Sequence, residues 1–325
     1  MRIGQNPAKS IDHVPQPARV TIAVVNYIPF LSGYYEQSLD VLKECLGSIL
    51  DNTPKWEEGS NTRFYDLMVF DNASCSEVKD YLLQMHSQDL IQYLVLSDRN
   101  IGKGGAWNLI FQGAPGDVIT YCDNDVYFYP EWLENSLRIL NTFPNVGMIT
   151  ARPMRTPEKY YSSTLEWAHK TVGVQLEKGQ FQSWETFKEH TDSVGISTEE
   201  SKTWFQESFD WKIKYHDTCA YIGAAHFQFT ALKETLKSVL PLQMDRPMGQ
   251  VRSLDEKLNK KGFLRLTSCK PLVKHLGNRL YGTSRLINSQ RINNEKKRLA
   301  DIPAVRRGLL WIYNWIFRLY YMEKS

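Results

Sequence analysis

ITYCDNDVYFYPEW, residues 119–132, is the most informative stretch of this chain. An apolar run typical of a buried strand ends in Asp123-Asn124-Asp125, and a helix is predicted to begin at Pro130. Two carboxylates one residue apart at a strand end can hold a hard divalent cation, Mg²⁺ or Mn²⁺, against phosphate oxygens. Asp and Asn are also common turn residues after strands, so this motif needs support from other parts of the sequence.

A second motif, SDRNIGKGGAWN (97–108), lies between a predicted strand and a predicted helix. Its glycines, which follow Asn100, allow the backbone to approach a ligand, and the start of the next helix favours a phosphate group. The motif matches neither G-x-G-x-x-G nor a P-loop, because no G-K-[ST] occurs in it. An ordinary glycine-rich turn is the alternative interpretation.

Short apolar runs alternate with segments of helical periodicity from Val20 to about Arg152. Strands are predicted over 20–27, 65–74, 91–98, 117–125 and 146–152, and helices over 35–50, 76–86, 104–113 and 130–143. This alternation predicts an α/β fold with a mostly parallel sheet flanked by helices. Ligands of such sheets bind at the carboxyl ends of the strands. The candidate polar residues all lie at such ends: Asn26, Asp71, Asn100, Asp123 and Asp125.

Residues 156–216 interrupt this pattern. They are aromatic and acidic and have no strong period-2 runs, so the segment is predicted to be a helical and irregular insertion. The alternation then resumes. An apolar run is found at 219–230, helices are predicted over 231–239 and 253–261, and short strands are predicted in FLRLT and PLVKH.

Composition and charge exclude some classes of protein function for this chain. The chain has 325 residues, of which 42% are apolar and 23% charged, and this composition excludes wholesale disorder. The net charge of +3 conceals an asymmetry: from Lys270 onward there are 12 basic and 3 acidic residues, against 27 and 33 before it. The basic end points to an anionic partner, whereas the chain as a whole is not basic enough for a nucleic-acid binder.

The cysteines and the N-terminal segment exclude further classes. Five scattered cysteines without a C-x-x-C pair argue against a disulfide framework or a zinc knuckle and favour a reducing cytosol. Residues 1–17 are polar, contain three prolines and lack the apolar region of a signal peptide, so a flexible arm is expected. No run of 18 apolar residues occurs in the sequence, which argues against a transmembrane helix.

The C-terminal segment, 279–325, combines basic residues with the aromatic stretch LLWIYNWIF (309–317). An amphipathic helix of this kind binds an anionic membrane surface through its rings and its positive charge. A helix docked on the domain or on another subunit is the alternative. The basic residues before the stretch are Lys296, Lys297, Arg298, Arg306 and Arg307.

Four motifs in this order resemble the family-2 glycosyltransferases of the GT-A type. They are VVNY (24–27), VFDNAS (69–74), NIGKGGAWN (100–108) and DND (123–125). The resemblance, closest to rhamnosyltransferase-like enzymes of bacterial polysaccharide assembly, implies a metal-dependent, inverting transfer. A UDP-, dTDP- or GDP-linked sugar would be the donor, and a hydroxyl of a glycan or a lipid-linked molecule the acceptor.

The same resemblance implies roles for individual residues. It places Mn²⁺ or Mg²⁺ at Asp123 and Asp125, with Asp123 also near the ribose, and it places Asp71 at the nucleobase. It places a further set around the nucleotide: Asn26, Asn100, Gly102, Gly105, Asn108 and Asn124. His275, in PLVKHLGN (271–278), would reach the metal or the diphosphate; a buried, hydrogen-bonded structural histidine is the alternative.

The catalytic base is harder to predict. Family members carry a Glu-Asp pair before a helix that ends in Gly-[Tyr/Phe], and this chain has the Gly-Phe at 262–263. A strict alignment, however, puts Gln-Val (250–251) in the acidic position. Asp255 is therefore predicted as the base, with Glu256 and Asp245 as alternatives, although a solvated acid in the first helical turn fits the pattern too. A non-catalytic sugar-nucleotide-binding or scaffold protein on the same fold remains open.

Composition and the resemblance together divide the chain into four parts. Residues 1–17 form the arm, 18–152 the nucleotide-sugar-binding half, 153–278 the acceptor-binding half with its helical insertion, and 279–325 the tail. Acceptor specificity is expected in the insertion, where aromatic side chains can pack against sugar rings. The protein is expected to be cytoplasmic and peripheral on the cytoplasmic face of a membrane, with no nucleic-acid partner.

Overall fold

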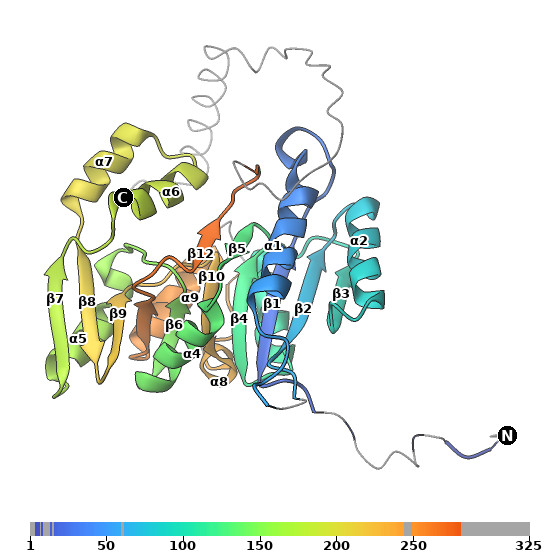
Figure 1. Ribbon diagram of the computed structural model, residues 1–325, viewed down its shortest axis with the longest axis horizontal. Coiled ribbons are helices and arrows are strands. Elements are labelled where there is room, and N and C mark those ends of the chain that lie inside the picture. Colours follow the sequence, from blue (N-terminus) through green and yellow to red (C-terminus); the bar gives the residue numbers. More distant parts are fainter. Residues whose placement is uncertain are drawn as a thin grey trace, which may run out of the picture. The chain divides into compact units, whose positions relative to one another are not determined.

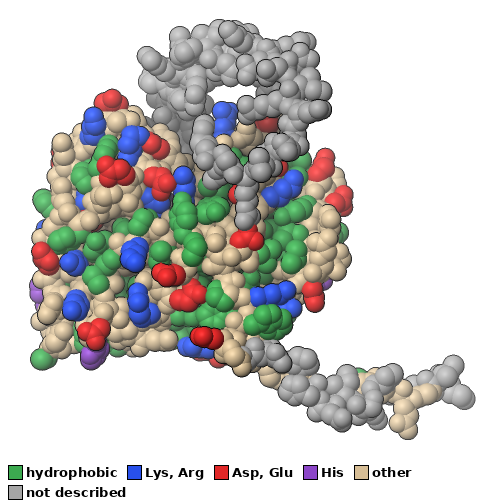
Figure 2. Space-filling model, viewed as in Figure 1, with side chains coloured by type: hydrophobic (Ala, Val, Ile, Leu, Met, Phe, Trp, Pro, Cys, Tyr) green, Lys and Arg blue, Asp and Glu red, His purple; other side chains and the backbone are tan. Residues whose placement is uncertain are grey.

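The computed structural model describes residues 4–6, 8, 14, 16–59, 62–243 and 249–280 (Figure 1). They fall within one unit, Met1–Tyr281, and the predicted tail from residue 281 onward lies outside the described residues, as does the alternative base Asp245. Acidic and basic side chains are interspersed on the face of the described unit shown in Figure 2.

The described residues form a sheet of ten strands in the order β3-β2-β1-β4-β10-β6-β11-β9-β8-β7. Its strands are β1 Val20–Asn26, β2 Tyr65–Asn72, β3 Tyr93–Ser97, β4 Val118–Asp123, β6 Val146–Thr150, β7 Val174–Gly179, β8 Asp210–Tyr215, β9 Thr218–Ile222, β10 Gln228–Leu232 and β11 Leu264–Thr267. Strands β3, β2, β1 and β4 are parallel, as are β6 and β11, and the other neighbours are antiparallel. A separate antiparallel pair joins β5 Val126–Phe128 to β12 Val273–His275.

Helices cover both faces of the sheet. They are α1 Ser38–Asn52, α2 Ser76–Ser87, α3 Gly102–Gly113, α4 Trp132–Thr142, α5 Ser162–Lys170, α6 Trp184–Ser193, α7 Thr198–Glu207, α8 Lys233–Lys237 and α9 Gly249–Lys260, with 3-10 turns at Gly33–Tyr35 and Glu158–Tyr160. Within the part of the chain that the structure describes, none of them has both the length and the apolar character needed to cross a membrane.

The core explains why the central strands are almost continuously apolar. Side chains of β1 alternate between two clusters: Ile22 and Val24 pack in one and Ala23 in the other. The first cluster includes residues of α1, α2 and α4, and the second includes residues of α3, α8 and α9. A parallel strand with both faces covered loses the polar alternation of a half-exposed strand, and this is the pattern seen in the sequence of β1 and β2.

The α/β architecture predicted from the sequence is confirmed. Every strand and helix predicted between Val20 and Arg152 is present, with its ends shifted by a few residues. The short strand β5 was not predicted. The apolar run at 219–230 is two strands rather than one, because the chain turns at Gly223, whose φ of 134° favours glycine.

The prediction for the insertion is wrong in part. It contains α5, α6 and α7, but β7 and β8 also pair in antiparallel fashion and extend the sheet. These two strands lie at the edge of the sheet, where side chains such as Lys178 and Lys214 stay exposed. Apolar and polar residues do alternate in VQLE (174–177) and WKIKY (211–215), but these runs are short and lie among other charged and aromatic residues, so the strands were not predicted.

Strand register places several candidate residues at one edge of the sheet. Asn26 at the end of β1 lies opposite Asp71 of β2, and Val25 lies opposite Asp123 of β4. The β5–β12 pair sets His275 opposite Val126, directly after Asp125. Segments about 150 residues apart in the chain therefore meet beside the Asp-Asn-Asp motif.

Candidate functional site

A pocket of about 300 Å³ opens at this edge of the sheet. Five of its nine lining residues belong to the set predicted from the sequence, namely Asn100, Gly102, Asp123, Asn124 and Asp125. The pocket thus joins the turn before α3 to the turn after β4. The first turn follows β3 and the second follows β4, so both lie at the carboxyl ends of strands in the parallel part of the sheet, where ligands of such folds bind.

Two carboxylates form the acidic side of the pocket. Asp123 accepts hydrogen bonds from the Tyr121 hydroxyl and from the Lys103 ammonium, whose Nζ lies 2.7 Å from Oδ1 and 2.8 Å from Oδ2. Asp125 Oδ2 lies 3.3 Å from His275 Nε2, and Asp125 Oδ1 is buried without a partner among the described residues. Burial raises the pKa of Asp125, an effect that the charge of His275 opposes. Its unpaired oxygen therefore needs a proton or a cation.

These groups fit a hard divalent cation as part of its coordination shell. Carboxylate oxygens are the ligands that Mg²⁺ and Mn²⁺ prefer, an imidazole nitrogen also suits Mn²⁺, and such ions often take only one or two carboxylates from the protein and the rest from phosphates and water. No group of three or more His, Cys, Asp or Glu in the described ranges is arranged to hold a metal by itself. The remaining ligands would therefore come from a bound substrate.

Lys103 was not singled out from the sequence. Besides pairing with Asp123, its Nζ lies 5.1 Å from the ring centre of Trp107 and 5.4 Å from that of Tyr121, so two aromatic faces hold the ammonium in the pocket. The signal was present in NIGKGGAWN as a cation in the first turn of α3. A lysine beside a helix N-terminus is suited to a phosphate group.

Asn100 and Gly102 shape the turn that lines the pocket. Asn100 Oδ1 accepts hydrogen bonds from Asn72 Nδ2 at 2.9 Å and from the Gly102 amide at 2.7 Å. Gly102 has a φ of 72°, which favours glycine. A Cβ on Gly105 would lie 3.0 Å from the Ile101 side chain, so this glycine allows close packing at the start of α3. Asn72, a pocket residue that was not predicted, is part of the VFDNAS motif.

Asp71 and Asn26 are placed behind the pocket rather than in it. Both are fully buried: Asn26 Nδ2 donates to Asp71 Oδ1 at 2.7 Å, and Asp71 Oδ2 accepts from the Ser74 amide at 3.0 Å. Asn26 Oδ1 in turn accepts from Asn124 Nδ2 at 2.6 Å. Asp71 has no exposed surface through which it could make the predicted contact with a nucleobase in this arrangement. The network instead fixes the turn that carries Asp123 and Asp125.

Asn108 is also directed away from the pocket. Its Oδ1 accepts from the Leu242 amide at 2.8 Å and its Nδ2 donates to the Leu242 carbonyl at 3.2 Å. Instead of contacting a nucleotide as predicted, the Asn108 side chain connects α3 to the segment that follows α8.

The structure does not present the predicted base, Asp255, to an acceptor. Asp255 is buried on α9, where its Oδ1 lies 2.7 Å from Arg265 Nη2 and 2.7 Å from His226 Nε2. Helix α9 begins at Gly249 rather than at the predicted Ser253, so Asp255 lies in its second turn and not in its solvated first turn. Glu256, one position further along α9, is exposed and forms an ion pair with Arg252 at 2.7 Å. The structure thus places Glu256 on the outer face of α9, outside the pocket.

His226, which the sequence did not single out, links Asp255 to the acidic side of the pocket. Its side chain is 20% exposed, against 4% for Asp255. The His226 carbonyl accepts from Lys103 Nζ at 3.4 Å, and the next carbonyl, of Phe227, accepts from the Asp123 amide at 2.8 Å. Burial lowers the pKa of His226, so the imidazole is neutral at pH 7. Because Nε2–H donates to the carboxylate, Nδ1 keeps a lone pair that can accept a proton.

Comparison with known proteins agrees with the resemblance in the motifs. The profile of the family described as "Glycosyl transferase family 2" matches residues 34–205. A relative from Nostoc sp. (strain PCC 7120), described as an uncharacterized glycosyltransferase, is 26% identical over 84 residues, which cover 26% of each chain. The chain therefore spans about a quarter of the length of this relative.

Two solved structures are similar to parts of this chain. TarS of S. aureus is 16% identical, with 44% of this chain and 39% of that chain covered and a TM-score of 0.33. The mannosyltransferase PcManGT of Pyrobaculum calidifontis, solved with GDP-Man and Mn²⁺, is 21% identical, with 47% and 42% covered and a TM-score of 0.34. This chain spans less than half the length of either protein.

Proposed function

Because this chain belongs to glycosyl transferase family 2, whose profile matches more than half of its residues, we propose that it is a metal-dependent glycosyltransferase. The donor would be a UDP-, dTDP- or GDP-linked sugar, and the acceptor a hydroxyl of a glycan or of a lipid-linked molecule. The observation that carries the proposal is the pocket that joins Asp123 and Asp125 to Lys103 and the N-terminus of α3.

The donor diphosphate matches the charges of this pocket. The first amides of α3 and the Lys103 ammonium offer positive charge, while Asp123 and Asp125 require a cation before they can lie beside phosphate oxygens. Asp123 and Asp125, with His275 beside them, would hold Mn²⁺ or Mg²⁺. The cation would neutralise the negative charge that develops on the leaving diphosphate.

The proposed transfer is a single displacement that inverts the anomeric configuration. The acceptor oxygen forms a bond to the anomeric carbon from one face while the bond to the diphosphate oxygen breaks on the other. The hydroxyl proton needs a base, and the more accessible member of the His226–Asp255 pair is His226. His226 Nδ1 would take the proton while Asp255 orients the ring, a division of roles known from other His–Asp pairs.

The proposal is tested by thermal stabilisation of the full chain with UDP-, dTDP- and GDP-sugars, each with Mn²⁺ and with EDTA. A donor at about 100 times its dissociation constant adds about 2.7 kcal/mol, which raises Tm by several degrees. We expect one nucleotide class to act in this way with Mn²⁺ and none with EDTA. Stabilisation by no nucleotide sugar would contradict the proposal.

The burial of Asp255 favours one other candidate, a protein that binds the donor without transferring its sugar. Transfer to water separates the two candidates, because a catalyst slowly hydrolyses its donor when no acceptor is present. Stabilisation by a nucleotide sugar without any release of free sugar or nucleotide, over hours and at saturating Mn²⁺, would identify the binder.

We further propose that the protein works at the cytoplasmic face of a membrane in the assembly of a cell-surface polysaccharide. The support is the basic and aromatic composition of 279–325 in the sequence. The full chain is expected to float with vesicles that contain anionic lipid and to stay in the soluble fraction with neutral vesicles. A variant in which Arg306 and Arg307 become Glu should lose flotation, and equal flotation of both proteins would contradict this placement.

A further inference from the structure

The insertion contains a second pocket, of about 330 Å³. It lies between the segment after β6, the end of β7, the start of β8 and α7, and it shares no lining residue with the pocket at Asp123 and Asp125. Helix α6 contacts both α7 and β12, the strand that carries His275. The volume is at the lower end of the range found for small-molecule sites, about 300–1,000 Å³.

Aromatic side chains from several elements line this second pocket. Trp204 of α7 is 40% exposed and Phe209, just before β8, is 49% exposed. Trp211 of β8 and Tyr161 complete the set. Large apolar rings left open to solvent in a concave site are unusual for a purely structural position. Rings of this kind offer flat faces that suit the C–H groups of a pyranose.

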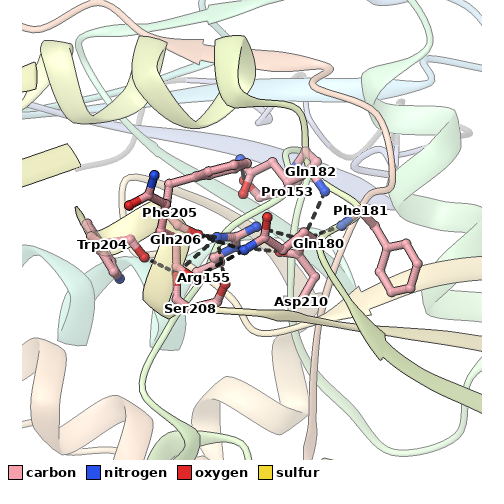
Figure 3. Close-up of polar contacts among 10 residues, drawn as sticks. All are labelled: Pro153, Arg155, Gln180, Phe181, Gln182, Trp204, Phe205, Gln206, Ser208 and Asp210. Carbon is pink, nitrogen blue, oxygen red and sulfur yellow. Dashed lines mark hydrogen bonds and ion pairs between the residues drawn. The ribbon is translucent and has the colours of Figure 1, made fainter. Parts of the chain in front are cut away.

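A buried arginine holds these walls in place, as Figure 3 shows. Arg155 Nε and Nη2 bond to the two carboxylate oxygens of Asp210 at 2.9 and 3.1 Å, and Nη1 bonds to the carbonyls of Phe205 and Ser208 at 2.8 and 3.0 Å. Asp210 Oδ2 also accepts from the amide of Phe181 at 2.8 Å. These bonds tie the end of α7 and the start of β8 to the segment after β6, so the pocket is formed before any ligand binds.

The charges around the pocket select against an anionic ligand. Arg155 is neutralised by Asp210 and uses its donors on protein groups, so it is not offered to a phosphate. Among the other lining residues are two carboxylates, Glu158 and Glu207, and one ammonium, Lys178, whose Nζ lies 5.2 Å from the Trp211 ring centre. Two negatively charged carboxylates outweigh one ammonium, so the pocket disfavours phosphate and sulfate groups. The same carboxylates can accept hydrogen bonds from the hydroxyl groups of a ligand.

A hydroxyl at the pocket also lacks a partner. Thr156 Oγ1 is buried and has no hydrogen bond within the described ranges, although Thr156 is a lining residue. Buried polar groups are nearly always bonded, and an unsatisfied one costs about 1–3 kcal/mol. The hydroxyl is thus held beneath the surface of the pocket wall, beside Gly223.

We propose that this pocket binds an uncharged saccharide unit of the acceptor glycan, away from the point of transfer. Its rings would pack against the sugar face, while Glu158 and Glu207 accept hydrogen bonds from sugar hydroxyls. That the saccharide belongs to an acceptor rests on the proposed glycosyltransferase function, whereas the binding itself does not. Helix α6 packs against α7, which lines this pocket, and against β12, which carries His275.

The test is saturation-transfer NMR on the full chain with chitotriose, cellotriose, maltotriose and mannotriose, backed by an array of neutral glycans and by mannose 6-phosphate. We expect at least one neutral saccharide to bind with a dissociation constant below about 10 mM, and the phosphorylated sugar not to bind. Trp204→Ala and Phe209→Ala are each expected to weaken this binding about tenfold or more. Trp56→Ala, at an exposed tryptophan outside both pockets, is the matched control and should leave it unchanged.

Each outcome separates this pocket from the donor site. The Trp204 and Phe209 variants should keep the Mn²⁺-dependent stabilisation by a nucleotide sugar, and Asp125→Asn should keep saccharide binding. The absence of any neutral ligand overturns the proposal, as does saccharide binding that survives in both aromatic variants while their Tm is unchanged. If the unaltered protein binds a neutral saccharide but is stabilised by no nucleotide sugar, the proposed function is wrong and the proposed saccharide pocket is still supported.

Discussion

Asp125→Asn is expected to lower the rate of sugar transfer at least about a hundredfold, the effect of losing a main electrostatic group at a reacting centre. One carboxylate oxygen is buried and has no partner among the described residues, and burial raises the pKa of the group, so a cation would relieve an unfavourable state. An amide has the same shape but no charge, and it binds a hard divalent cation much more weakly.

The thermal stability of the Asp125→Asn variant distinguishes loss of metal binding from damage to the fold. The amide removes a buried negative charge that is costly without a cation, so the Tm of the metal-free variant should be equal to or higher than that of the parent. The stabilisation by Mn²⁺ with a nucleotide sugar should disappear. Asp217→Asn, at an exposed position in the β8–β9 turn, is the matched control for both measurements. A fully active Asp125→Asn variant would remove this residue from the metal site.

Asp255→Asn is expected to destabilise the fold by about 3–5 kcal/mol, because it leaves the buried guanidinium of Arg265 without a counter-charge. The Arg265 side chain is fully buried, and burial lowers its pKa while Asp255 opposes that shift. For a chain of this size the change corresponds to a fall in Tm of roughly 10 °C. Thermal unfolding followed by circular dichroism measures it directly.

The adjacent acid gives the matched control. Glu256→Gln breaks only an exposed pair with Arg252, so Tm should change by less than about 2 °C and activity should not change. The double variant Asp255→Leu with Arg265→Met removes both buried charges and should recover part of the lost stability. If Asp255→Asn abolishes transfer while Tm stays unchanged, Asp255 is not mainly a structural partner of Arg265 and acts in the transfer itself, as the base or as the group that orients His226.

The parallel half of the fold was predictable because its signals are local. Strands such as β1 and β2 are buried on both faces, so their sequences are apolar throughout, and helices of 11 to 15 residues follow with clear periodicity. The strands β7 and β8 were missed because they bury only part of their surface, and their short alternating runs lie within an aromatic and acidic segment that hides them. The amount of surface that an element buries thus decides how visible it is in the sequence.

The sequence alone determined the family resemblance and the positions of Asp123, Asp125 and the turn at Asn100, because strand ends and turns are encoded by neighbouring residues. Only the tertiary structure decided which side chains meet. It paired Asp255 with Arg265, set His275 beside Asp125, enclosed Asp71 behind the pocket, and formed a second pocket around Arg155. Such contacts depend on strand register and on helix packing between distant segments, so they cannot be predicted from any local pattern of residues.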